Sequence, residues 1–416
     1  MERLPGFRDF YPEPLPHPDV WSADARQYIF DQWRKIAKRY GFREYDGPPL
    51  EPLELFTTKS GAEIVGQLYN FKDKGDREVS LRPEMTPTLA RMAAAHERNY
   101  KKPMKWFAIP QLFRYERQQK GRLREHFQLN ADLIGETDPA ADAELISLLI
   151  DTLRAFGLTA EDFVIRLSSR NAWQEFFETR SQEPEARSQN AYDFFQIIDK
   201  LERTPPEESE KKLSALGFSL AAVNEFIAAG KPTAELESIL QNLAARGLQD
   251  FIKIDYQVIR GLAYYTGVVF EAFDRKGEFR AIAGGGRYNN LVKLISGGKV
   301  DLAALGFGMG DVVLLELLKA RGLLPKFDSP MDVFVTIEDE TLRGISLKLV
   351  HNLRAAGFAV EYPLVPTKAD KQFKRAQDLK VAHTVRAESD ASVRIRKMTT
   401  RDEDVAGFAD AANHLG

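Results

Sequence analysis

Cations gather between residues 113 and 128, in the stretch FRYERQQKGRLREHFQ, with aromatic and acidic side chains between them. They are Arg114, Arg117, Lys120, Arg122 and Arg124. Arginine suits phosphate binding, because its planar guanidinium group donates paired, charge-assisted hydrogen bonds. A solvent-exposed hairpin would contain the same residue types. This stretch alone therefore leaves a phosphate site and an exposed turn as alternatives.

Alternation along this stretch predicts one polar and one apolar face. If residues 113–117 and 122–132 are antiparallel strands around a turn at 118–121, successive side chains point to opposite faces. Arg114 and Glu116 then share a face of the first strand. The second strand places on one face Arg124, His126, Gln128, Asn130 and Asp132. Such a face either lies in water or forms the floor of a site for a zwitterion and a phosphate.

Other stretches supply groups of the same kinds, and each also has a purely structural interpretation. Glu84 and Thr86, in SLRPEMTPTLA, precede a helix and fit a capping motif. Arg260 precedes the pair Tyr264 and Tyr265 in IRGLAYYTGVVFE, which fits core aromatic residues beside a surface arginine. Glycines interrupt the strand patterns AIAGGGRYNNLV and ALGFGMGDVV. They weaken a strand unless something must approach its backbone closely. We find neither a dinucleotide-binding glycine fingerprint nor a Walker P-loop.

The elements that must position these groups follow from periodicity and helix caps. A helix is expected over about 22–40, with Ser22 as its N-cap and Gly41 at the left-handed C-terminal position. Two further helices are expected near 87–98 and 139–156. Short alternating runs between the helices, joined by tight turns, favour an antiparallel sheet.

The predicted fold class is therefore α+β, with an antiparallel sheet flanked by helices over residues 1–325. Short helical patterns at about 171–248 predict a helical insertion within this domain. Beyond a break at 322–330, strands and helices alternate. This alternation predicts a small α/β domain with a mostly parallel sheet over 331–416.

Overall composition limits the classes of protein and of site. The chain of 416 residues exceeds one ordinary core, so two or three domains are expected. Its formal net charge is −3, so a nucleic-acid partner must be met by local positive patches. The chain contains no cysteine, which excludes disulfides, thiolate metal sites and cysteine nucleophiles. It has no apolar run long enough for a membrane span and no secretory signal pattern, so a cytoplasmic location is expected.

Taken together, these motifs resemble those of histidyl-tRNA synthetases, which are class II aminoacyl-tRNA synthetases. LPGFRDFYP resembles the family's opening, and FREYDGPPLEPLELF resembles motif 1, with Pro48 at its signature position. FRYERQQKGRLREHFQL resembles motif 2, and RGLAYYTGVVFE with GGGRYNNLV resembles the histidine-specific signatures. DKQFKRAQDL fits the C-terminal domain. The resemblance implies a class II catalytic domain over 1–325 and an anticodon-binding domain over 331–416.

This resemblance implies that the protein activates histidine with ATP and Mg²⁺ and then transfers it to tRNA(His). Glu84, Thr86 and Gln128 would accept hydrogen bonds from the substrate ammonium group. Asp132 and Tyr265 would bind the two imidazole nitrogens, so that other amino acids leave buried groups unpaired. The full set assigned to histidine is Glu84, Met85, Thr86, Arg114, Gln128, Asp132, Arg260, Tyr264 and Tyr265.

The resemblance also assigns residues to ATP and to tRNA. Arg114 would bind the α-phosphate, and Arg260 would bridge it to the carboxylate; these two are the catalytic residues. The ATP-binding set is Arg114, Glu116, Arg122 and Arg287, with magnesium beside Glu116. The tRNA-binding set is Arg117, Gln118, Gln119 and Lys120 near the acceptor end. Lys368, Lys371, Lys374 and Arg375 form a basic helix face that either meets the anticodon stem or lies in water. A homodimer through motif 1 is implied.

The chain departs from the family pattern at three positions. Ala263 stands where the family usually has an aspartate, and Val313 stands where motif 3 has the arginine that stacks on adenine. Arg287 is our candidate substitute for that arginine. Asp132 replaces a longer glutamate, so its reach to the imidazole requires a shifted strand or a water. The alternative function is a non-charging paralogue that binds histidine, like the regulatory subunit of ATP phosphoribosyltransferase. That paralogue lacks the anticodon-binding domain.

Overall fold

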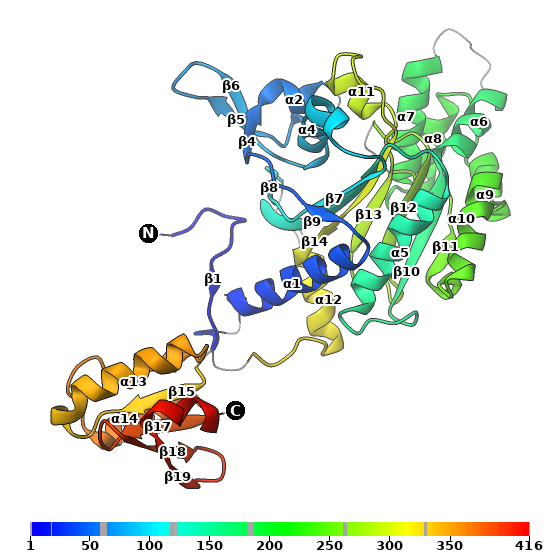
Figure 1. Ribbon diagram of the computed structural model, residues 1–416. Coiled ribbons are helices and arrows are strands. Elements are labelled where there is room, and N and C mark those ends of the chain that lie inside the picture. The colour runs from blue at the N-terminus through cyan, green and yellow to red at the C-terminus, as the bar shows by residue number, and fades with distance from the viewer. Residues whose placement is uncertain are drawn as a thin grey trace. The chain divides into compact units, whose positions relative to one another are not determined.

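The computed structural model describes residues 2–17, 19–58, 65–116, 121, 123–180, 187–260, 264–327 and 331–415. The chain forms two compact units, Met1–Leu324 and Pro325–Gly416. Figure 1 shows the elements of each unit, and we describe each unit by itself.

The N-terminal unit is built on a central sheet with the strand order β11-β10-β12-β13-β14-β9-β7-β3, in which β8 also pairs with β9. The strands are β3 (Arg43–Glu44), β7 (Met104–Ala108), β8 (Gln111–Phe113), β9 (Glu125–Ile134), β10 (Phe163–Ser169), β11 (Ile252–Ile254), β12 (Val268–Asp274), β13 (Ala283–Arg287) and β14 (Ala304–Gly310). Pairing is antiparallel from β10 to β7, as predicted. The terminal pairs β10–β11 and β3–β7 are parallel, so the complete sheet is mixed.

Strand β9 shows how the sheet separates core from site. Leu129, Ala131 and Leu133 are buried on the face that packs against helix α5 (Ala140–Arg154). The alternate residues His126, Gln128, Asn130 and Asp132 line a cavity on the opposite face. The predicted polar face of this strand is therefore confirmed for those four residues.

Helix α1 (Ala23–Arg39) covers α5 and begins and ends where the sequence predicts. The Ser22 hydroxyl accepts a hydrogen bond from the Ala25 amide at 3.1 Å. Gly41 has a φ of +78°, which terminates the helix in the left-handed region. Ile29 and Trp33 are among the residues of its buried stripe. The apolar stripe, rather than helix propensity, therefore fixes this helix on the domain.

Shorter elements complete the N-terminal unit. Strands β4 (Leu50–Pro52), β6 (Glu78–Leu81) and β5 (Tyr69–Lys72) form an antiparallel sheet, and β1 (Phe10–Tyr11) pairs with β2 (Trp21–Ser22) in parallel. Outside the β10–β11 connection, the other described helices of this unit are α2 (Leu53–Thr57), α4 (Thr86–His96), η1 (Glu97–Asn99), α11 (Leu291–Ile295) and α12 (Asp311–Arg321). Helix α4 packs against α11, and α12 packs against β9.

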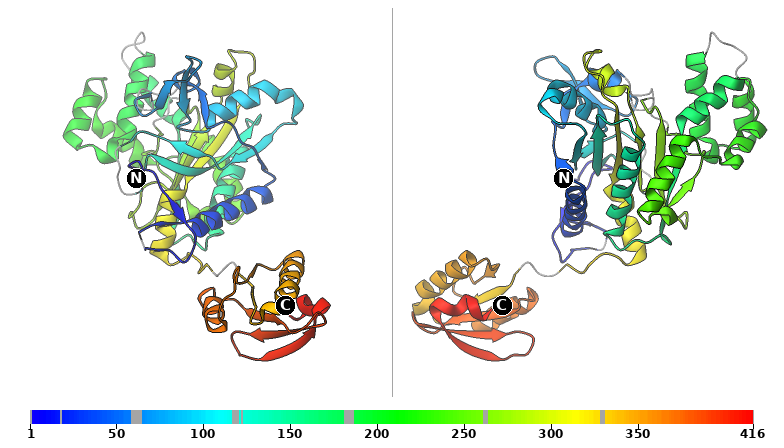
Figure 2. Two further views of the ribbon diagram at one scale, coloured as in Figure 1. Left: turned by 90° about the vertical axis from the view of Figure 1, so that its left-hand side faces the viewer. Right: turned by 45° about the vertical axis from the view of Figure 1, so that its right-hand side comes forward.

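A group of helices lies between β10 and β11 in the sequence. They are α6 (Arg170–Arg180), α7 (Arg187–Asp199), η2 (Leu201–Arg203), α8 (Pro206–Ser214), α9 (Leu220–Ala229), α10 (Ala234–Ala245) and η3 (Gln249–Phe251). In Figure 2 these helices, drawn in green, gather beside the sheet edge. Their core is aromatic, with Trp173, Phe176, Phe194 and Phe218 in mutual ring contact.

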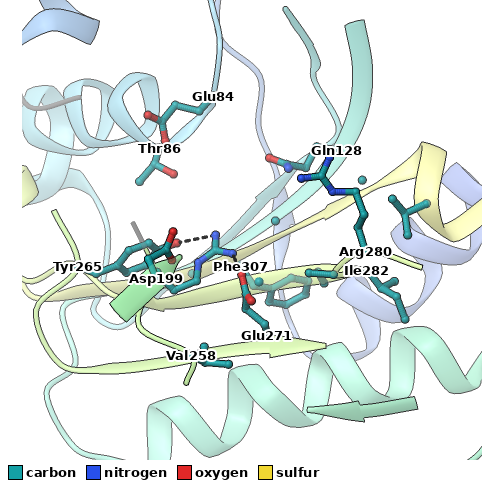
Figure 3. A pocket seen from close by; sticks show the side chains of 18 of the residues that line it. Glu84, Thr86, Gln128, Asp199, Val258, Tyr265, Glu271, Arg280, Ile282 and Phe307 are labelled. Carbon is teal, nitrogen blue, oxygen red and sulfur yellow. Dashed lines mark hydrogen bonds and ion pairs between the residues drawn. The ribbon is translucent and has the colours of Figure 1, made fainter. Parts of the chain in front are cut away.

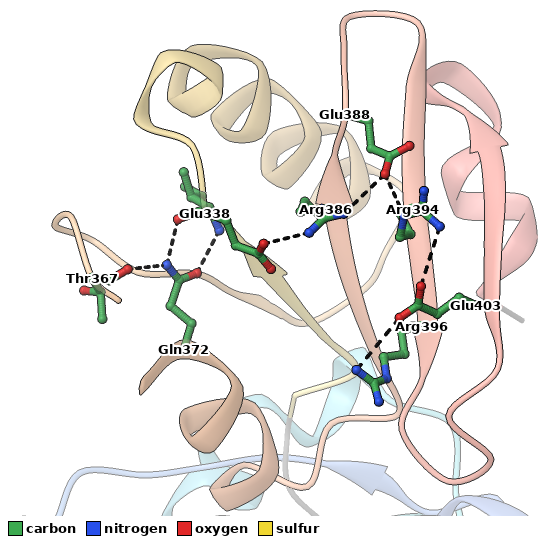
Figure 4. Close-up of polar contacts among 9 residues, drawn as sticks. Glu338, Thr367, Gln372, Arg386, Glu388, Arg394, Arg396 and Glu403 are labelled. Atoms are coloured by element: carbon green, nitrogen blue, oxygen red, sulfur yellow. Dashed lines mark hydrogen bonds and ion pairs between the residues drawn. The ribbon is translucent and has the colours of Figure 1, made fainter. Parts of the chain in front are cut away.

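The C-terminal unit has the strand order β16-β15-β17-β18-β19. Its elements are β15 (Val333–Thr336), η4 (Glu340–Leu342), α13 (Arg343–Ala355), β16 (Val360–Glu361), α14 (Ala369–Asp378), β17 (His383–Ala387), β18 (Ser392–Lys397), β19 (Glu403–Gly407) and η5 (Phe408–His414). Buried Gln372 of α14 bonds to both backbone groups of Ile337, just after β15 (Figure 4).

The prediction of a mostly parallel sheet for this unit is wrong. Strand β15 pairs in parallel with β16 and β17, but β17–β18 and β18–β19 are antiparallel. The connections explain the difference, because helices join the parallel strands whereas short turns join the last three, and a short turn permits only antiparallel pairing. Strand β19 was not predicted. Within the described ranges, no helix combines the length and the apolar character needed to cross a bilayer.

Candidate active site

A cavity of about 900 Å³ lies on the polar face of the central sheet. Its floor is formed by β9, β13 and β14, and its walls by the residues before α4, the segment leading to Tyr265, and η2 of the helical group. In Figure 3, Glu84 and Thr86 face the cavity from one side, Gln128 and Arg280 from another, and Tyr265 with Glu271 lies below. Segments distant in the sequence thus converge on one volume.

Glu84 contributes a buried carboxylate with one unused oxygen. The Tyr264 hydroxyl donates to Glu84 Oε2 at 2.6 Å, while Oε1 has no partner among the described residues. Glu84 is only 4% exposed, and this burial raises its pKa, against the opposing effects of Arg114, Tyr264 and Arg260. A buried acceptor without a donor indicates that a ligand supplies one, and an ammonium group does so well.

Asp132 contributes a second buried carboxylate. The Tyr288 hydroxyl donates to Asp132 Oδ1 at 2.5 Å, and burial raises the pKa of Asp132 to about 7. Its strand neighbour across the ladder is Gly306. A Cβ atom at Gly306 would lie 1.8 Å from Asp132 Oδ1, and one at Gly308 would lie 2.7 Å from the Gln128 side chain. The glycines of β14 therefore provide the space that these two side chains occupy.

Arg260 is held in a strained position beside the cavity. Its φ is +60°, a region that non-glycine residues rarely adopt, and the Arg170 guanidinium donates to its carbonyl at 3.0 Å. Its Nη1 donates to Glu271 Oε1 at 2.5 Å. Burial alone would lower the pKa of Arg260, but the neighbouring Tyr265 and Glu271 raise it, so the group stays charged. A Cβ atom at Gly284 would lie 2.2 Å from Arg260 Nη1.

Arg114 supplies the second cation of the cavity. Its Nε donates to the Pro83 carbonyl at 2.9 Å, and its amide donates to the Arg124 carbonyl at 2.9 Å. The amide bond extends the β8–β9 ladder by one residue, the Nε bond anchors the guanidinium group to the Pro83 carbonyl, and both Arg114 and Glu116 line the cavity. The cavity is therefore lined by Arg114 and Arg260, together with Arg203, Arg280 and the partly unpaired carboxylate of Glu84.

Several predicted residues lie elsewhere. Arg124 turns away from the cavity, because its Nε donates to the Glu116 carbonyl at 3.3 Å and its guanidinium lies 4.1 Å from the Tyr115 ring centre. Met85 is fully buried, and it is not among the residues that line the cavity. Its predicted contact with histidine is therefore not supported for the side chain. Arg117, Gln118, Gln119, Lys120, Arg122 and Ala263 fall outside the described residues.

The prediction that Arg287 binds ATP is wrong. Arg287 is 2% exposed and does not line the cavity. Its guanidinium group donates to both carboxylate oxygens of Asp142 and to the carbonyls of Glu136 and Asp138. All three guanidinium nitrogens are thus used within the protein. Arg287 ties the end of β13 to the start of α5 and is buried away from the cavity.

Several residues that shape the site were not predicted from the sequence. Tyr288, Glu271, Phe307 and Arg280 line the cavity, as do Gln196, Asp199, Glu202 and Arg203 from the helical group. Tyr288 directly follows GGGR in the sequence, so alternation along that strand was the available signal. No local signal relates the helical group to the cavity. Val313 lies at one end of the cavity, where a Cβ on Gly121 would approach its side chain to 3.4 Å.

A buried ion network fixes the elements around this cavity. Arg8 Nε donates to Glu125 Oε1 at 2.6 Å, and Arg8 Nη1 donates to Asp311 Oδ2 at 2.8 Å. Asp311 Oδ1 also accepts from the Phe127 amide at 3.0 Å. The Arg8 side chain is 1% exposed. The N-terminal segment, the start of β9 and the start of α12 are therefore joined through one guanidinium group.

A largely antiparallel sheet, with helix α5 on one face and a cavity of cations and carboxylates on the other, is the arrangement of the catalytic domain of a class II aminoacyl-tRNA synthetase. A family model described as "Histidyl-tRNA synthetase" matches residues 17–310. The chain belongs to the histidyl-tRNA synthetase family.

Curated relatives support this membership over nearly the whole chain. A protein of Opitutus terrae named "Histidine--tRNA ligase" is 48% identical over 97% of this chain and 95% of its own length. A chloroplastic/mitochondrial histidine--tRNA ligase of Arabidopsis thaliana is 38% identical over 89% of this chain and 77% of its own length.

Solved structures support the fold. The histidyl-tRNA synthetase of Nostoc sp. PCC 7120 matches with a TM-score of 0.75 at 22% identity, covering 94% of this chain and 95% of that one. An apo histidyl-tRNA synthetase of S. aureus matches with a TM-score of 0.70 at 23% identity, over the full length of both chains.

Proposed function

We propose that this protein activates L-histidine with ATP to form histidyl-adenylate, and then transfers the histidyl group to the 3′ end of tRNA(His). The observation that carries the proposal is the unpaired Glu84 Oε1 in a cavity that also contains Arg114 and Arg260. An acceptor for an ammonium group thus shares one volume with cations suited to a carboxylate and a phosphate. The curated names of the relatives supply the reaction.

The histidine side of the site divides into two parts. Glu84, Thr86 and Gln128 lie where they can accept from the substrate ammonium group. Asp132 and Tyr265 lie across the cavity floor and bind the imidazole nitrogens, with Tyr264 holding Glu84 in place. Discrimination arises because any amino acid without two ring nitrogens leaves Asp132 or Tyr265 buried and unpaired.

The ATP side relies on position and charge rather than on a general base. Arg114 binds the α-phosphate, and Arg260 bridges it to the substrate carboxylate. Both stabilise the negative charge that increases at phosphorus as the acyl-phosphate bond forms. Because the Glu271 carboxylate already orients Arg260, little reorganisation is needed in the transition state.

Magnesium fits this site as an ion that accompanies ATP. The described residues contain no group of three acidic or histidine side chains that would hold a metal by themselves. Glu116 lines the cavity beside Arg114, and Mg²⁺ commonly takes one or two carboxylates together with substrate phosphates. When bound, the ion would neutralise the outer phosphates, and Glu116 would help to hold it.

The proposal extends to tRNA, to assembly and to location. Arg117, Gln118, Gln119, Lys120 and Arg122 remain our candidates for the acceptor end and the outer phosphates. Lys368, Lys371, Lys374 and Arg375 are exposed on or beside α14, whose Gln372 and Ala376 are buried, and would meet the anticodon stem.

We also propose a cytoplasmic homodimer, supported by the exposed apolar side chains of Leu50 and Phe71 on the small sheet.

Pyrophosphate exchange into ATP tests the proposal. The purified protein is incubated with ATP, labelled pyrophosphate and each of the twenty amino acids in turn. We expect exchange with histidine alone, followed by charging of tRNA(His). Exchange with a different amino acid would overturn the assigned specificity. Histidine binding without any exchange would instead support the regulatory alternative.

A further inference from the structure

Tyr45 has a buried hydroxyl group that the proposed function leaves unused. The residue directly follows β3, and its amide donates to the Phe107 carbonyl of β7 at 2.9 Å. Its hydroxyl is buried and has no hydrogen-bond partner in the described part of the chain. A hydroxyl group withdrawn from water without a partner is unfavourable, so its position requires an explanation.

The sheet places Tyr45 on the face that carries the histidine site. Arg43 is opposite Trp106, and Trp106 is opposite Asp132, so these residues share one face across three strands. Tyr45 is two residues beyond Arg43 and therefore points to the same face. Its ring centre lies 5.7 Å from that of Trp106. Tyr45 also packs against the apolar cluster that contains Tyr264, Tyr265 and Tyr288.

Asp132 is the acceptor within reach of this face. Tyr288 occupies its Oδ1 atom, while none of the described residues donates to Oδ2. After burial itself, the charge of Asp132 is the largest influence that raises the pKa of Tyr45. The other charged groups near Tyr45 are Arg82 and Asp46, which pair with each other at 3.2 Å. Asp132 is therefore the charged group on this sheet face that acts most strongly on the Tyr45 hydroxyl.

No direct hydrogen bond joins the Tyr45 hydroxyl to the Asp132 carboxylate, so a bridging molecule is needed to connect them. A water molecule between them would accept from the Tyr45 hydroxyl and donate to Asp132 Oδ2, and buried waters typically have two to four such polar partners. The carboxylate would then receive a donor on each oxygen. It would also be held in the charged form that accepts from an imidazole N–H.

We propose that Tyr45 is a positioning residue for histidine recognition, which donates to Asp132 through one buried water and keeps that carboxylate anionic and oriented toward the imidazole. This inference rests on the proposed function, because it assigns the imidazole to Asp132. It adds a donor from motif 1 to a site otherwise built from motif 2, the tyrosine pair and the segment that contains Glu84 and Thr86. The expected consequence is a weaker and more pH-sensitive histidine site when the hydroxyl is removed.

The test compares Tyr45→Phe with the wild-type protein in pyrophosphate exchange between pH 6 and 9. We expect KM for histidine at pH 7 to rise about fivefold, which is the scale of one hydrogen bond, while kcat changes less than twofold. The midpoint of the pH dependence of KM should move to higher pH, because Asp132 loses a donor. A purely packing role for Tyr45 would leave that midpoint unchanged, and this result would overturn the inference.

Two further variants separate this inference from other causes. Tyr100→Phe removes a hydroxyl from a ring that also contacts Trp106, at 4.9 Å, but from a residue that is 40% exposed. We expect it to match the wild type. In an Asp132→Asn background, Tyr45→Phe should add no further loss of histidine affinity by calorimetry, whereas an additive loss would contradict the proposed coupling. Exchange by the wild type in the same assay tests the proposed function independently.

Discussion

Both units place arginines beside a β-sheet, but the two sets differ in the carboxylates around them. In the N-terminal unit, Arg260 pairs with Glu271, has a side chain that is 22% exposed, and lines a cavity where Glu84 has an unused oxygen. In the C-terminal unit, Arg386, Arg394 and Arg396 lie on β17 and β18 with about a third of each side chain exposed (Figure 4). The N-terminal site thus includes a buried, incompletely paired carboxylate, whereas the C-terminal arginines are paired with carboxylates and partly solvated.

The C-terminal arginines are each paired with a carboxylate of the protein. Arg386 and Arg394 are direct neighbours across the β17–β18 ladder, where like charges repel. Glu388 relieves this repulsion, since it accepts from Arg386 at 3.3 Å and from Arg394 at 2.6 Å. These bonds hold the pKa of Glu388 below its usual value, with the Arg394 bond as the largest cause. Within the described residues, each of these arginines has a carboxylate partner.

This difference between exposed ion pairs and a buried, incompletely paired carboxylate indicates which unit binds a ligand. Exposed ion pairs contribute little to stability and need no further partner. A buried carboxylate with one unpaired oxygen is unfavourable in the empty protein, so it is retained where a ligand completes it. The number of arginines alone does not distinguish the two units, whereas the buried carboxylate of Glu84 with its unpaired oxygen does.

The largest expected effect is at Arg260. Arg260→Ala removes a preorganised charge from the cavity, and we expect kcat/KM for histidine-dependent exchange to fall about a hundredfold, or about 3 kcal/mol. Arg260→Lys retains a cation near Glu271 but lacks the planar fork, so it should recover only part of this loss. Exchange rates and circular dichroism of both variants provide the measurement. An exchange rate for Arg260→Ala close to that of the wild type would contradict the proposed functional difference between the two regions.

A smaller effect is expected from pH. Burial raises the pKa of Asp132 to about 7, and histidine requires the anion, so its binding releases a proton and weakens as pH falls below 7. The anionic fraction falls about fivefold between pH 7 and pH 6, which adds to the titration of the substrate imidazole. In Asp132→Asn, KM should follow the substrate titration alone. Identical pH profiles for the two proteins would show that Asp132 does not titrate in this range.

The smallest effect is expected in the C-terminal unit. Arg386→Ala removes exposed contacts with Glu338 and Glu388, which are 2.7 Å and 3.3 Å long. We expect histidine-dependent exchange to stay within about twofold of the wild type and the melting temperature to change little, because exposed pairs contribute weakly. Calorimetric melting and exchange measure both quantities. A loss of exchange comparable with that of Arg260→Ala would show that pairing and exposure do not separate the regions.

The parts of the fold that could be predicted are those that depend on neighbouring residues in the sequence. Helix α1 followed from Ser22, Gly41 and a regular apolar stripe, all of which are properties of neighbouring residues. The antiparallel centre of the main sheet followed from alternating strands joined by tight turns. The direction of β18 was not predicted, because the alternation of strands and helices earlier in that unit suggested a parallel sheet.

The site was predictable where a residue's role depends on its own motif. Glu84, Arg114, Asp132, Arg260 and Tyr265 lie in one cavity as expected, although their assigned roles remain proposals.

The roles of other residues depend on contacts between distant segments, which the sequence alone does not reveal. Arg287 was misassigned, because its partner Asp142 and the two carbonyls are on a different element. The unused hydroxyl of Tyr45 and the buried partners of Arg8 likewise emerge only when distant segments meet.

The glycines of β13 and β14 have a consequence for how this protein can vary. At Gly284 and Gly306 the wall of the pocket is bare peptide, and the nearest atom to any added carbon is a functional side chain. A neighbour elsewhere in a protein can move to accommodate a larger residue, but here the neighbours are Arg260 and Asp132, the proposed substrate-binding groups. A single methyl group at either glycine would therefore displace one of these two side chains from its position.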